Sequence, residues 1–529
     1  MRKIGTGRSP SHVFAEIPNV SIPRSSFDRS HALKTTFDSG YLIPTLVDEV
    51  LPGDSFKLDV SDFARLSTPI VPFMDNLYLD RFFFFVPYRL LWTNFQVFMG
   101  EQDDPLSPTS YLVPQVVASG AGGFAVGSLF DYFGLPTAVN SLSVSAFASR
   151  AYNLIWNEWF RDENLQTTKA VVDKDDGPDT VTDYVLKKRG KRHDYFTSCL
   201  PWAQKADPVQ MSLGSTAPIM LDMTLTASNK VLRASDRNGP SVAGAGWQID
   251  ASNNIENSVS TDVVIDPNGQ WYADLSTATA ATINSLRESV ALQHFYELDA
   301  RGGTRYTEIV RAHFGVVSPD ARLQRPEYLG GSSTRINVYP IPQNSATGAT
   351  GTPQGNLAAM GVSAHSGTGF VKSFTEHGII LGLVSVRADL TYQQGLHRSW
   401  TRQTREDFFW PSFAHLGEQA VLSKEIYCDG SVDDEDVFGY QERYAEYRYK
   451  PSQITGKFRS TYATSLDVWH LAQEFGARPT LNATFIEENP PVDRVVAVNT
   501  EPQFLYDAYF SMRCARPMPL YSVPGLNRL

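Results

Sequence analysis

The chain has 529 residues, of which 42% are hydrophobic and 12% aromatic, and its formal net charge is −11. This composition excludes a generally disordered chain, because it supplies enough apolar side chain for a large buried core. Three widely separated cysteines exclude a disulfide scaffold and a zinc knuckle, and predict synthesis in a reducing cytosol. We expect neither secretion nor a membrane span, because no signal-peptide core and no run of about 18 apolar residues is present.

The two ends of this acidic chain are basic. Residues 1–34 carry six basic and two acidic side chains, a net charge of +4, and residues 511–529 carry three arginines and no acid. A basic, Ser- and Pro-rich arm can bind polyanions by neutralising their phosphates. A flexible, solvated terminus explains the same composition equally well.

Four consecutive phenylalanines, Phe82, Phe83, Phe84 and Phe85, predict a strand that is buried on both faces. They belong to the stretch LDRFFFFVPYRLLWTNF. In an extended strand, alternate side chains point to opposite faces, so two phenylalanines lie on each side of the sheet. We therefore place these four residues and Trp92 in the core or in a subunit interface.

Helical and strand patterns alternate irregularly along the rest of the chain. Apolar periodicity predicts helices over 143–160, 285–303 and 306–315. Strand patterns cover 378–393, 440–450 and 504–514. We expect the strand from residue 378 to run from the deep core to a polar face that carries Ser385 and Arg387. Because strands and helices do not alternate regularly, antiparallel sheets with helical insertions are favoured over a doubly wound fold.

Two polar stretches, 225–282 and 339–369, are rich in Ser, Thr, Asn, Gly and Ala. Segments of this length that contain few large apolar residues are usually surface excursions. We interpret both as loops on one scaffold, because strand or helix patterns resume on each side of them.

The common local motifs of catalysis are missing from the sequence: it has no phosphate-binding loop, zinc helix, nucleophile elbow or CxxC. We interpret the scattered histidines, including His313, His377, His397 and His415, as structural, because they lack metal-ligand spacing. The aromatic runs at 408–410 and 156–159 could stack on bases, but Lys and Arg are dispersed, which favours the core or a subunit interface.

Six long blocks spread over the whole chain carry a family resemblance. They are VFAEIPNVSIPRSSFDRSH (13–31), DRFFFFVPYRLLWTNF (80–95), RGGTRYTEIVRAHFGVVSPDARLQRPEYLGG (301–331), HGIILGLVSVRADLTYQQGLHRSWTRQTREDFFWP (377–411), HLGEQAVLSKEIYC (415–428) and MRCARPMPLYSVPGL (512–526). Through these blocks the sequence closely resembles the major capsid proteins of the Microviridae, small single-stranded-DNA bacteriophages, and specifically the gokushovirus branch. The stretches 225–282 and 339–369 take no part in the resemblance.

The resemblance implies a mainly β fold, an eight-stranded antiparallel jelly roll with helical and long-loop insertions. It implies a structural protein, not an enzyme, whose copies form a small T=1 icosahedral shell around circular single-stranded DNA in the virion, assembled in the host bacterial cytoplasm. No cofactor and no metal ion is implied. The implied partners are other copies of the chain, genomic DNA, an internal scaffolding protein, a small DNA-binding protein, a pilot protein and a host cell-surface receptor.

The same resemblance divides the chain into regions. We expect a basic arm inside the shell (1–40), two parts of the jelly roll (41–224 and 283–529), and a protrusion for host attachment (225–282). The polar stretch 339–369 is the second candidate for the protrusion. Charge alone selects the arm residues expected to contact DNA or scaffold: Arg2, Lys3, Arg8 and Arg24. The residues expected on the protrusion are Asn238, Gly239, Trp247, Asn253 and Asn254.

Two rival classes stay open at this point. A carbohydrate-active β-sandwich enzyme would also explain the aromatic residues and long loops, and a β-sandwich lectin would do so without catalysis. Neither explains the long family blocks or the two basic ends.

Overall fold

The computed structural model describes residues 23–101, 110–207, 209, 283–303, 306–315, 324–344 and 354–521, together with six short strands between residues 219 and 273. The chain divides into two compact units, residues 204–314 and the rest. The basic arm residues Arg2, Lys3 and Arg8 lie outside the described residues.

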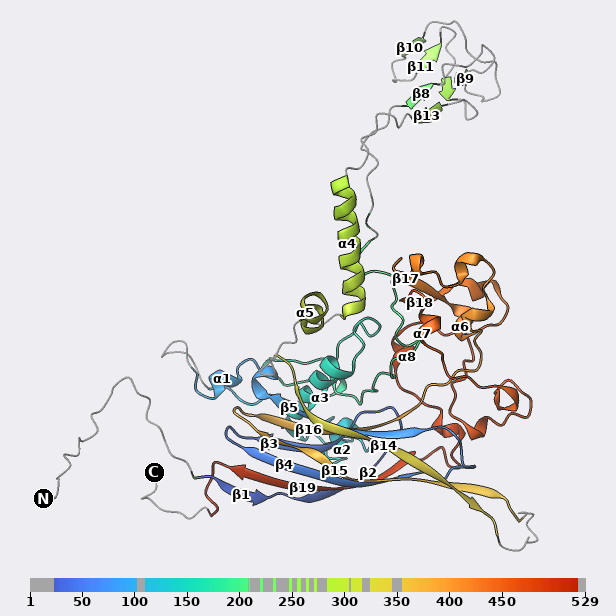
Figure 1. Ribbon diagram of the computed structural model, residues 1–529. Helices are drawn as coiled ribbons and strands as arrows, with labels where there is room; N and C mark the ends of the chain where they lie inside the picture. Colours follow the sequence, from blue (N-terminus) through green and yellow to red (C-terminus); the bar gives the residue numbers. More distant parts are fainter. Residues whose placement is uncertain are drawn as a thin grey trace, which may run out of the picture. The chain divides into compact units, whose positions relative to one another are not determined.

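Nine strands of the described residues form one curled antiparallel sheet (Figure 1). They are β1 (Ser25–Asp28), β2 (His31–Phe37), β3 (Ile43–Val50), β4 (Ser55–Leu66), β5 (Leu77–Pro87), β14 (Glu327–Pro342), β15 (Leu357–Ser373), β16 (Gly378–Ala388) and β19 (Phe504–Arg516). The order is β1-β19-β4-β15-β14-β5-β16-β3, and β2 also pairs with β19. The protein is thus mainly β, as the sequence predicts.

The long hairpin of β14 and β15 makes the sheet curl. The second part of β14, from Asn337, pairs with β15, whereas its first part pairs with β5. The two arms of the sheet can therefore face each other across one hydrophobic core. Side chains of that core come from both arms, including Phe56 and Leu58 of β4 and Phe83 and Phe85 of β5.

The phenylalanine run lies on β5 and has a different environment on each face. Phe83 and Phe85 point into the core between the two arms. Phe84, only 1% exposed, packs on the opposite face with Trp92, and the partly buried Phe82 lies against the same cluster. Both faces of β5 are therefore covered within one chain, with no neighbouring subunit needed.

The second face of β5 is covered by the segment that follows it. This segment contains α1 (Phe95–Phe98), β6 (Gln115–Val117), α2 (Leu129–Tyr132), β7 (Ser143–Ser145) and α3 (Phe147–Ile155), which continues as a π-helical turn, Trp156–Phe160. The ring of Phe84 lies 5.6 Å from the ring of Trp159, and the Tyr152 hydroxyl donates to the Leu42 carbonyl at 2.9 Å. The sequence-predicted helix at 143–160 is thus confirmed from Phe147 on.

A third hydrophobic cluster contains Tyr392, Phe438 and Phe485 from the region between β16 and β19, together with Phe196 from an earlier part of the chain. This region contains β17 (Glu418–Leu422), α6 (Ser423–Ile426), β18 (Val437–Glu442), α7 (Ala445–Arg448) and α8 (Ala483–Ile486). The strand predicted at 440–450 is wrong after Glu442, because Tyr444 takes a left-handed backbone conformation with φ of 62° and a helical turn follows.

The unit of residues 204–314 contains two helices, α4 (Ile283–Gly302) and α5 (Tyr306–Phe314), which confirm the predicted helical patterns. His313 of α5 contacts Asp299 of α4 at 2.7 Å. The short strands pair as β8 (Ile219–Leu221) with β13 (Trp271–Ala273), β9 (Leu232–Ala234) with β12 (Val263–Ile265), and β10 (Trp247–Ile249) with β11 (Ile255–Asn257). In the part of the chain that the structure describes, no helix has the length and apolarity needed to cross a membrane.

Two sequence predictions about polar segments are wrong. The stretch 339–369 is not one loop: Tyr339–Pro342 ends β14, and β15 begins at Leu357. Polar and small residues suit these strands because many of their side chains face solvent. The end of β16 is not a polar surface either, since Ser385 and Arg387 are buried, and Arg387 Nε donates to the Asp80 carboxylate at 2.8 Å.

A buried ion pair joins the two arms inside the core. Arg81 of β5 forms a salt bridge with Asp62 of β4, and both side chains are almost fully buried. The Tyr506 hydroxyl donates to the same carboxylate at 2.8 Å, and Arg81 Nη1 donates to the Thr334 hydroxyl at 3.0 Å. Because the opposed charges lie in a low-dielectric interior, losing either partner leaves an uncompensated charge.

We expect Phe84→Ala to lower the free energy of unfolding by about 3–5 kcal/mol, because it leaves a cavity beneath the covering segment. Phe82→Ala, at a partly buried position, is the matched control and should cost about 1–2 kcal/mol. Urea denaturation of the two variants measures the difference. Equal losses would contradict the two-sided burial of β5.

We expect Arg81→Met to cost about 3–5 kcal/mol, because it strands the Asp62 carboxylate in the core. The double variant Arg81→Met/Asp62→Leu removes both charges and should recover most of that loss. The midpoint of urea unfolding for the wild type and the two variants tests this. If the double variant unfolds more easily than Arg81→Met, the loss of stability comes from losing the ion pair and not from the unpaired Asp62 carboxylate.

Candidate functional site

The described residues contain no group of three or more His, Cys, Asp or Glu side chains that could hold a metal ion. Two of the histidines that lack metal-ligand spacing have other contacts. The ring of His377 packs on Phe95, and His397 Nδ1 lies 2.8 Å from the Ser399 hydroxyl at the start of a 3-10 turn.

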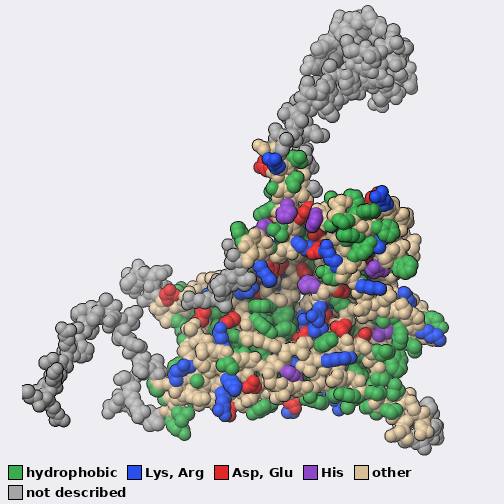
Figure 2. Space-filling view, viewed as in Figure 1, with side chains coloured by type: hydrophobic (Ala, Val, Ile, Leu, Met, Phe, Trp, Pro, Cys, Tyr) green, Lys and Arg blue, Asp and Glu red, His purple; other side chains and the backbone are tan. Residues whose placement is uncertain are grey.

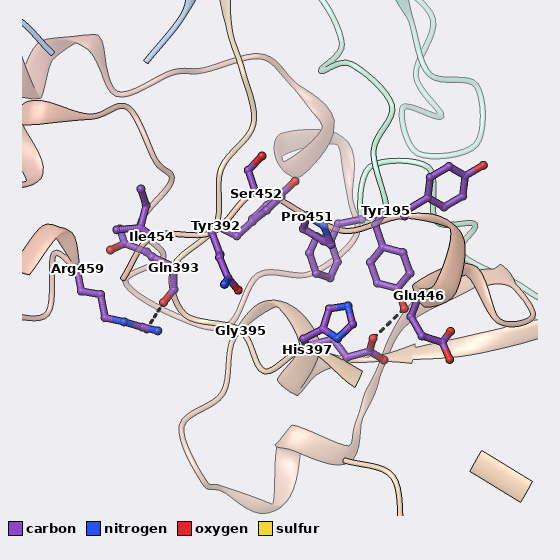
Figure 3. A pocket seen from close by; sticks show the side chains of 14 residues that line it. Tyr195, Tyr392, Gln393, Gly395, His397, Glu446, Pro451, Ser452, Ile454 and Arg459 are labelled. Atoms are coloured by element: carbon purple, nitrogen blue, oxygen red, sulfur yellow. Dashed lines mark hydrogen bonds between the residues drawn. The ribbon is translucent and has the colours of Figure 1, made fainter. Parts of the chain in front are cut away.

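A small cavity in the third cluster brings together several titratable groups (Figure 3). Its volume is about 50 Å³, room for a few water molecules only. The Tyr195 hydroxyl donates to Glu425 at 2.8 Å, and Arg398 donates to the other carboxylate oxygen at 3.1 Å. Burial raises the pKa of Glu425, and Arg398 opposes this rise. Because its polar groups bind one another, the cavity is a structural polar centre rather than a substrate pocket.

The strands next to the two basic ends of the chain lie side by side at one corner of the sheet, because β1 pairs antiparallel with the end of β19. Ser25 lies opposite Arg516, and Asp28 lies opposite Arg513. Residues 1–24 and the residues after Arg516 therefore join the sheet at the same corner. Figure 1 shows β1 and the end of β19 side by side at the lower left.

Arg24 is the one predicted arm residue that the structure describes. Its Nη2 donates to the Ser55 hydroxyl at 2.9 Å and to the Ala515 carbonyl at 3.3 Å, which fixes it at this corner. Trp247 lies in β10, where only its backbone is described. The other predicted protrusion residues, Asn238, Gly239, Asn253 and Asn254, lie outside the described residues.

The outward face of β4 and β19 begins at this corner of the sheet. Lys57 lies directly opposite Arg513, and both side chains are exposed. Arg65, Phe63 and Tyr509 are exposed on the same two strands, and the two rings are each about half accessible. Asp28 of β1 lies on the other side of Arg513, and Asp59 and Asp507 are exposed on the same face, so cations and acids alternate along it. The sequence pattern of β19 predicts which side chains face outward, but not that β4 lies beside it.

A second surface feature is a group of aromatic rings beside the β17–β18 ribbon. We call it the aromatic cluster: Phe408, Phe409, Trp410, Phe413, Tyr444 and Tyr447, with Arg402, Arg405 and Arg443 on its rings. Three of its rings are about half exposed. Hydrophobic side chains reach the surface beside Lys and Arg in this region (Figure 2). The aromatic run 408–410 is thus not core, unlike the buried Trp156.

Comparisons with known proteins point to one family. The family model described as capsid protein (F protein) matches residues 15–526. The capsid protein VP1 of Bdellovibrio phage phiMH2K is 49% identical over 533 residues, 99% of this chain and 99% of the relative. The capsid protein VP1 of Chlamydia phage 1 is 45% identical and that of Spiroplasma virus 4 is 38% identical, each over 98% of both chains.

These matches run over nearly the full length of the chain, and they include the phenylalanine run, the β16 segment and the β19 segment on which the sheet is built. The chain therefore belongs to the capsid protein (F protein) family, in the gokushovirus branch of the Microviridae.

Proposed function

We propose that this capsid protein is the major subunit of a T=1 icosahedral shell that encloses circular single-stranded DNA. The order of the strands in the large sheet is the observation that supports this proposal most directly. The curled sheet resolves into two four-stranded arms, β2-β19-β4-β15 and β3-β16-β5-β14, with β1 as an extension of β2. Two antiparallel arms of four strands packed over one core are the arrangement of an eight-stranded jelly roll, a fold that builds many viral shells.

The basic corner gives this subunit a side that suits the genome. Arg24 is fixed at the corner, and the charged arm with Arg2, Lys3 and Arg8 joins the sheet there. Lys57 and Arg513 lie opposite each other on the outward face of β4 and β19, with the exposed acids Asp28 and Asp59 nearby. We propose that this side faces the shell interior and contacts DNA, an internal scaffolding protein and a small DNA-binding protein. Phosphate neutralisation would make such contacts salt-dependent and independent of sequence.

The insertion at 225–282 is proposed as the outer protrusion that meets a host cell-surface receptor. Its polar composition and its place in the separate unit of residues 204–314 support this role. Asn238, Gly239, Trp247, Asn253 and Asn254 are the residues proposed for that surface. The stretch 339–369 is a weaker candidate, since β14 and β15 occupy most of it.

A pilot protein is the remaining proposed partner. We propose that the shell assembles in the host bacterial cytoplasm and that the chain then resides in the virion.

Replacing Arg2, Lys3 and Arg8 with Gln should reduce the salt dependence of single-stranded DNA binding. Each lost phosphate contact lowers the slope of log K against log salt by about 0.7, so the slope should fall by about 2. Fluorescence anisotropy with a labelled oligonucleotide measures it. The matched control replaces three exposed cations elsewhere, Arg287, Arg335 and Lys457, with Gln. An unchanged slope in the arm variant, or an equal fall in the control, would contradict the proposed DNA contact.

Assembly itself is tested by producing the chain together with the scaffolding protein of its phage. Sedimentation velocity and negative-stain electron microscopy should show closed, uniform icosahedral particles. A chain that stays a monomer or small oligomer in the presence of scaffold would contradict the shell proposal, and glycan-binding and hydrolase assays would then test the two rival classes.

A further inference from the structure

The aromatic cluster places several large rings on the surface of the subunit. Phe408, Phe409 and Tyr447 are each about half accessible, and Trp410 is 37% accessible. Since a large aromatic side chain offers ~200 Å², the four rings leave on the order of 400 Å² in contact with water. The largest apolar patch of a typical monomer covers about 300–600 Å² and is often functional, which makes the cluster a candidate interaction site.

Two arginines of the cluster have no salt bridge among the described residues, although the exposed acids Glu406 and Asp407 follow Arg405 directly. Arg405 stacks on Trp410, and Arg443 stacks on Tyr444. Among the described residues, neither guanidinium has a carboxylate within salt-bridge distance. The Nε of Arg443 is buried and has no hydrogen-bond partner there. A carboxylate of a partner would form a salt bridge with a guanidinium at this surface. The buried Nε of Arg443 lies out of its reach.

A complementary surface lies on the same chain. The connection between β17 and β18 contains an acidic turn, residues 429–436, with five carboxylates in eight residues. Arg478 binds Asp429 and Asp434, and Lys424 binds Glu435, whereas Asp433 and Asp436 are exposed and have no cation partner among the described residues. Val432, 89% exposed, stands among these acids. The turn therefore presents one apolar side chain flanked by free carboxylates.

The two surfaces lie at opposite ends of the β17–β18 ribbon. Glu418 pairs with Glu442 at the end that leads into the aromatic cluster, and Leu422 pairs with Val437 at the end that carries the acidic turn. Five residues of strand separate these ends by roughly 13 Å. A hollow of about 510 Å³ is lined by residues from both ends, including Arg443 and Glu435.

We infer that the aromatic cluster of one copy binds the acidic turn of a second copy, in a head-to-tail contact between subunits. The inference rests on the proposed shell and names one of its contacts. Arg405 and Arg443 meet the free carboxylates Asp433 and Asp436, while Val432 packs against the exposed rings. In a twofold-symmetric contact, the aromatic clusters of two copies would face each other. Their arginines would then repel, because neither cluster itself contains a carboxylate to offer the other. A heterologous contact of this kind closes into a ring when repeated around a symmetry axis, as a closed shell requires.

Charge exchange tests the contact. Arg405→Glu and Asp433→Lys each place like charges at the contact, and each should lower the yield of assembled particles roughly tenfold. The double variant carries the exchanged pair at every contact and should restore most of the yield. Val432→Ser changes a side chain that folding of the free chain does not bury, and it should lower the yield as well. The thermal midpoint of each free variant reports that it is folded.

Sedimentation velocity and electron microscopy, with scaffolding protein present, measure the amounts of shells and of smaller oligomers in each sample. Shells from the wild type and from every variant would overturn the contact but leave the shell proposal standing. A loss with Arg405→Glu alone, or a double variant that stays as poor as the single ones, would also overturn it. A wild type that forms neither oligomers nor shells would contradict both the contact and the proposed function.

Discussion

The strand β5 must bury both of its faces, and the rest of the large unit is arranged around that requirement. One face supplies Phe83 and Phe85 to the core between the two arms of the sheet, and the other places Phe84 beneath α3 and its π-helical turn. A single antiparallel sheet usually leaves one face in water. Here the covering segment fills that face, so the sheet and its insertion share one strand and form one packed body.

Buried polar pairs fix how this body is assembled. Arg81 and Asp62 link the two arms inside the core, while Asp80 on the opposite face of β5 binds Arg189 and Arg387. Burial raises the pKa of Asp80, but these arginines and a hydrogen bond from Ser333 outweigh burial and hold the pKa below its usual value. The carboxylate therefore stays ionised. Strand β5 thus forms buried ion pairs on both of its faces, in addition to its aromatic packing.

The sequence predicts those parts of the fold whose local pattern is strong. The phenylalanine run, the alternation of β19 and the apolar stripe of α3 each identify an element that the structure contains. Strands β14 and β15 were missed because much of their surface faces solvent, so small polar residues suffice there. Arg387 was expected at a surface because its partner Asp80 lies far away in sequence. Pairing between distant strands, not local pattern, decides such positions.

The functional surfaces were only partly predictable for the same reason. Charge counts identify a basic arm and a basic tail, but only the register of β1 with β19 brings them to one corner. The aromatic run 408–410 was predicted to lie in the core or in a subunit interface, and its exposure excludes the core. The capsid protein thus completes its hydrophobic core within one subunit and exposes charged and aromatic side chains on its surface.

The most direct test is a cryo-electron microscopy reconstruction of DNA-filled particles made from this chain. The account predicts that the corner of β1 and β19, with Arg24, Lys57 and Arg513, lies on the inner surface against density for nucleic acid. It also predicts that a neighbouring copy covers the aromatic cluster. A corner on the outer surface, or inner-surface density that avoids these cations, would contradict it.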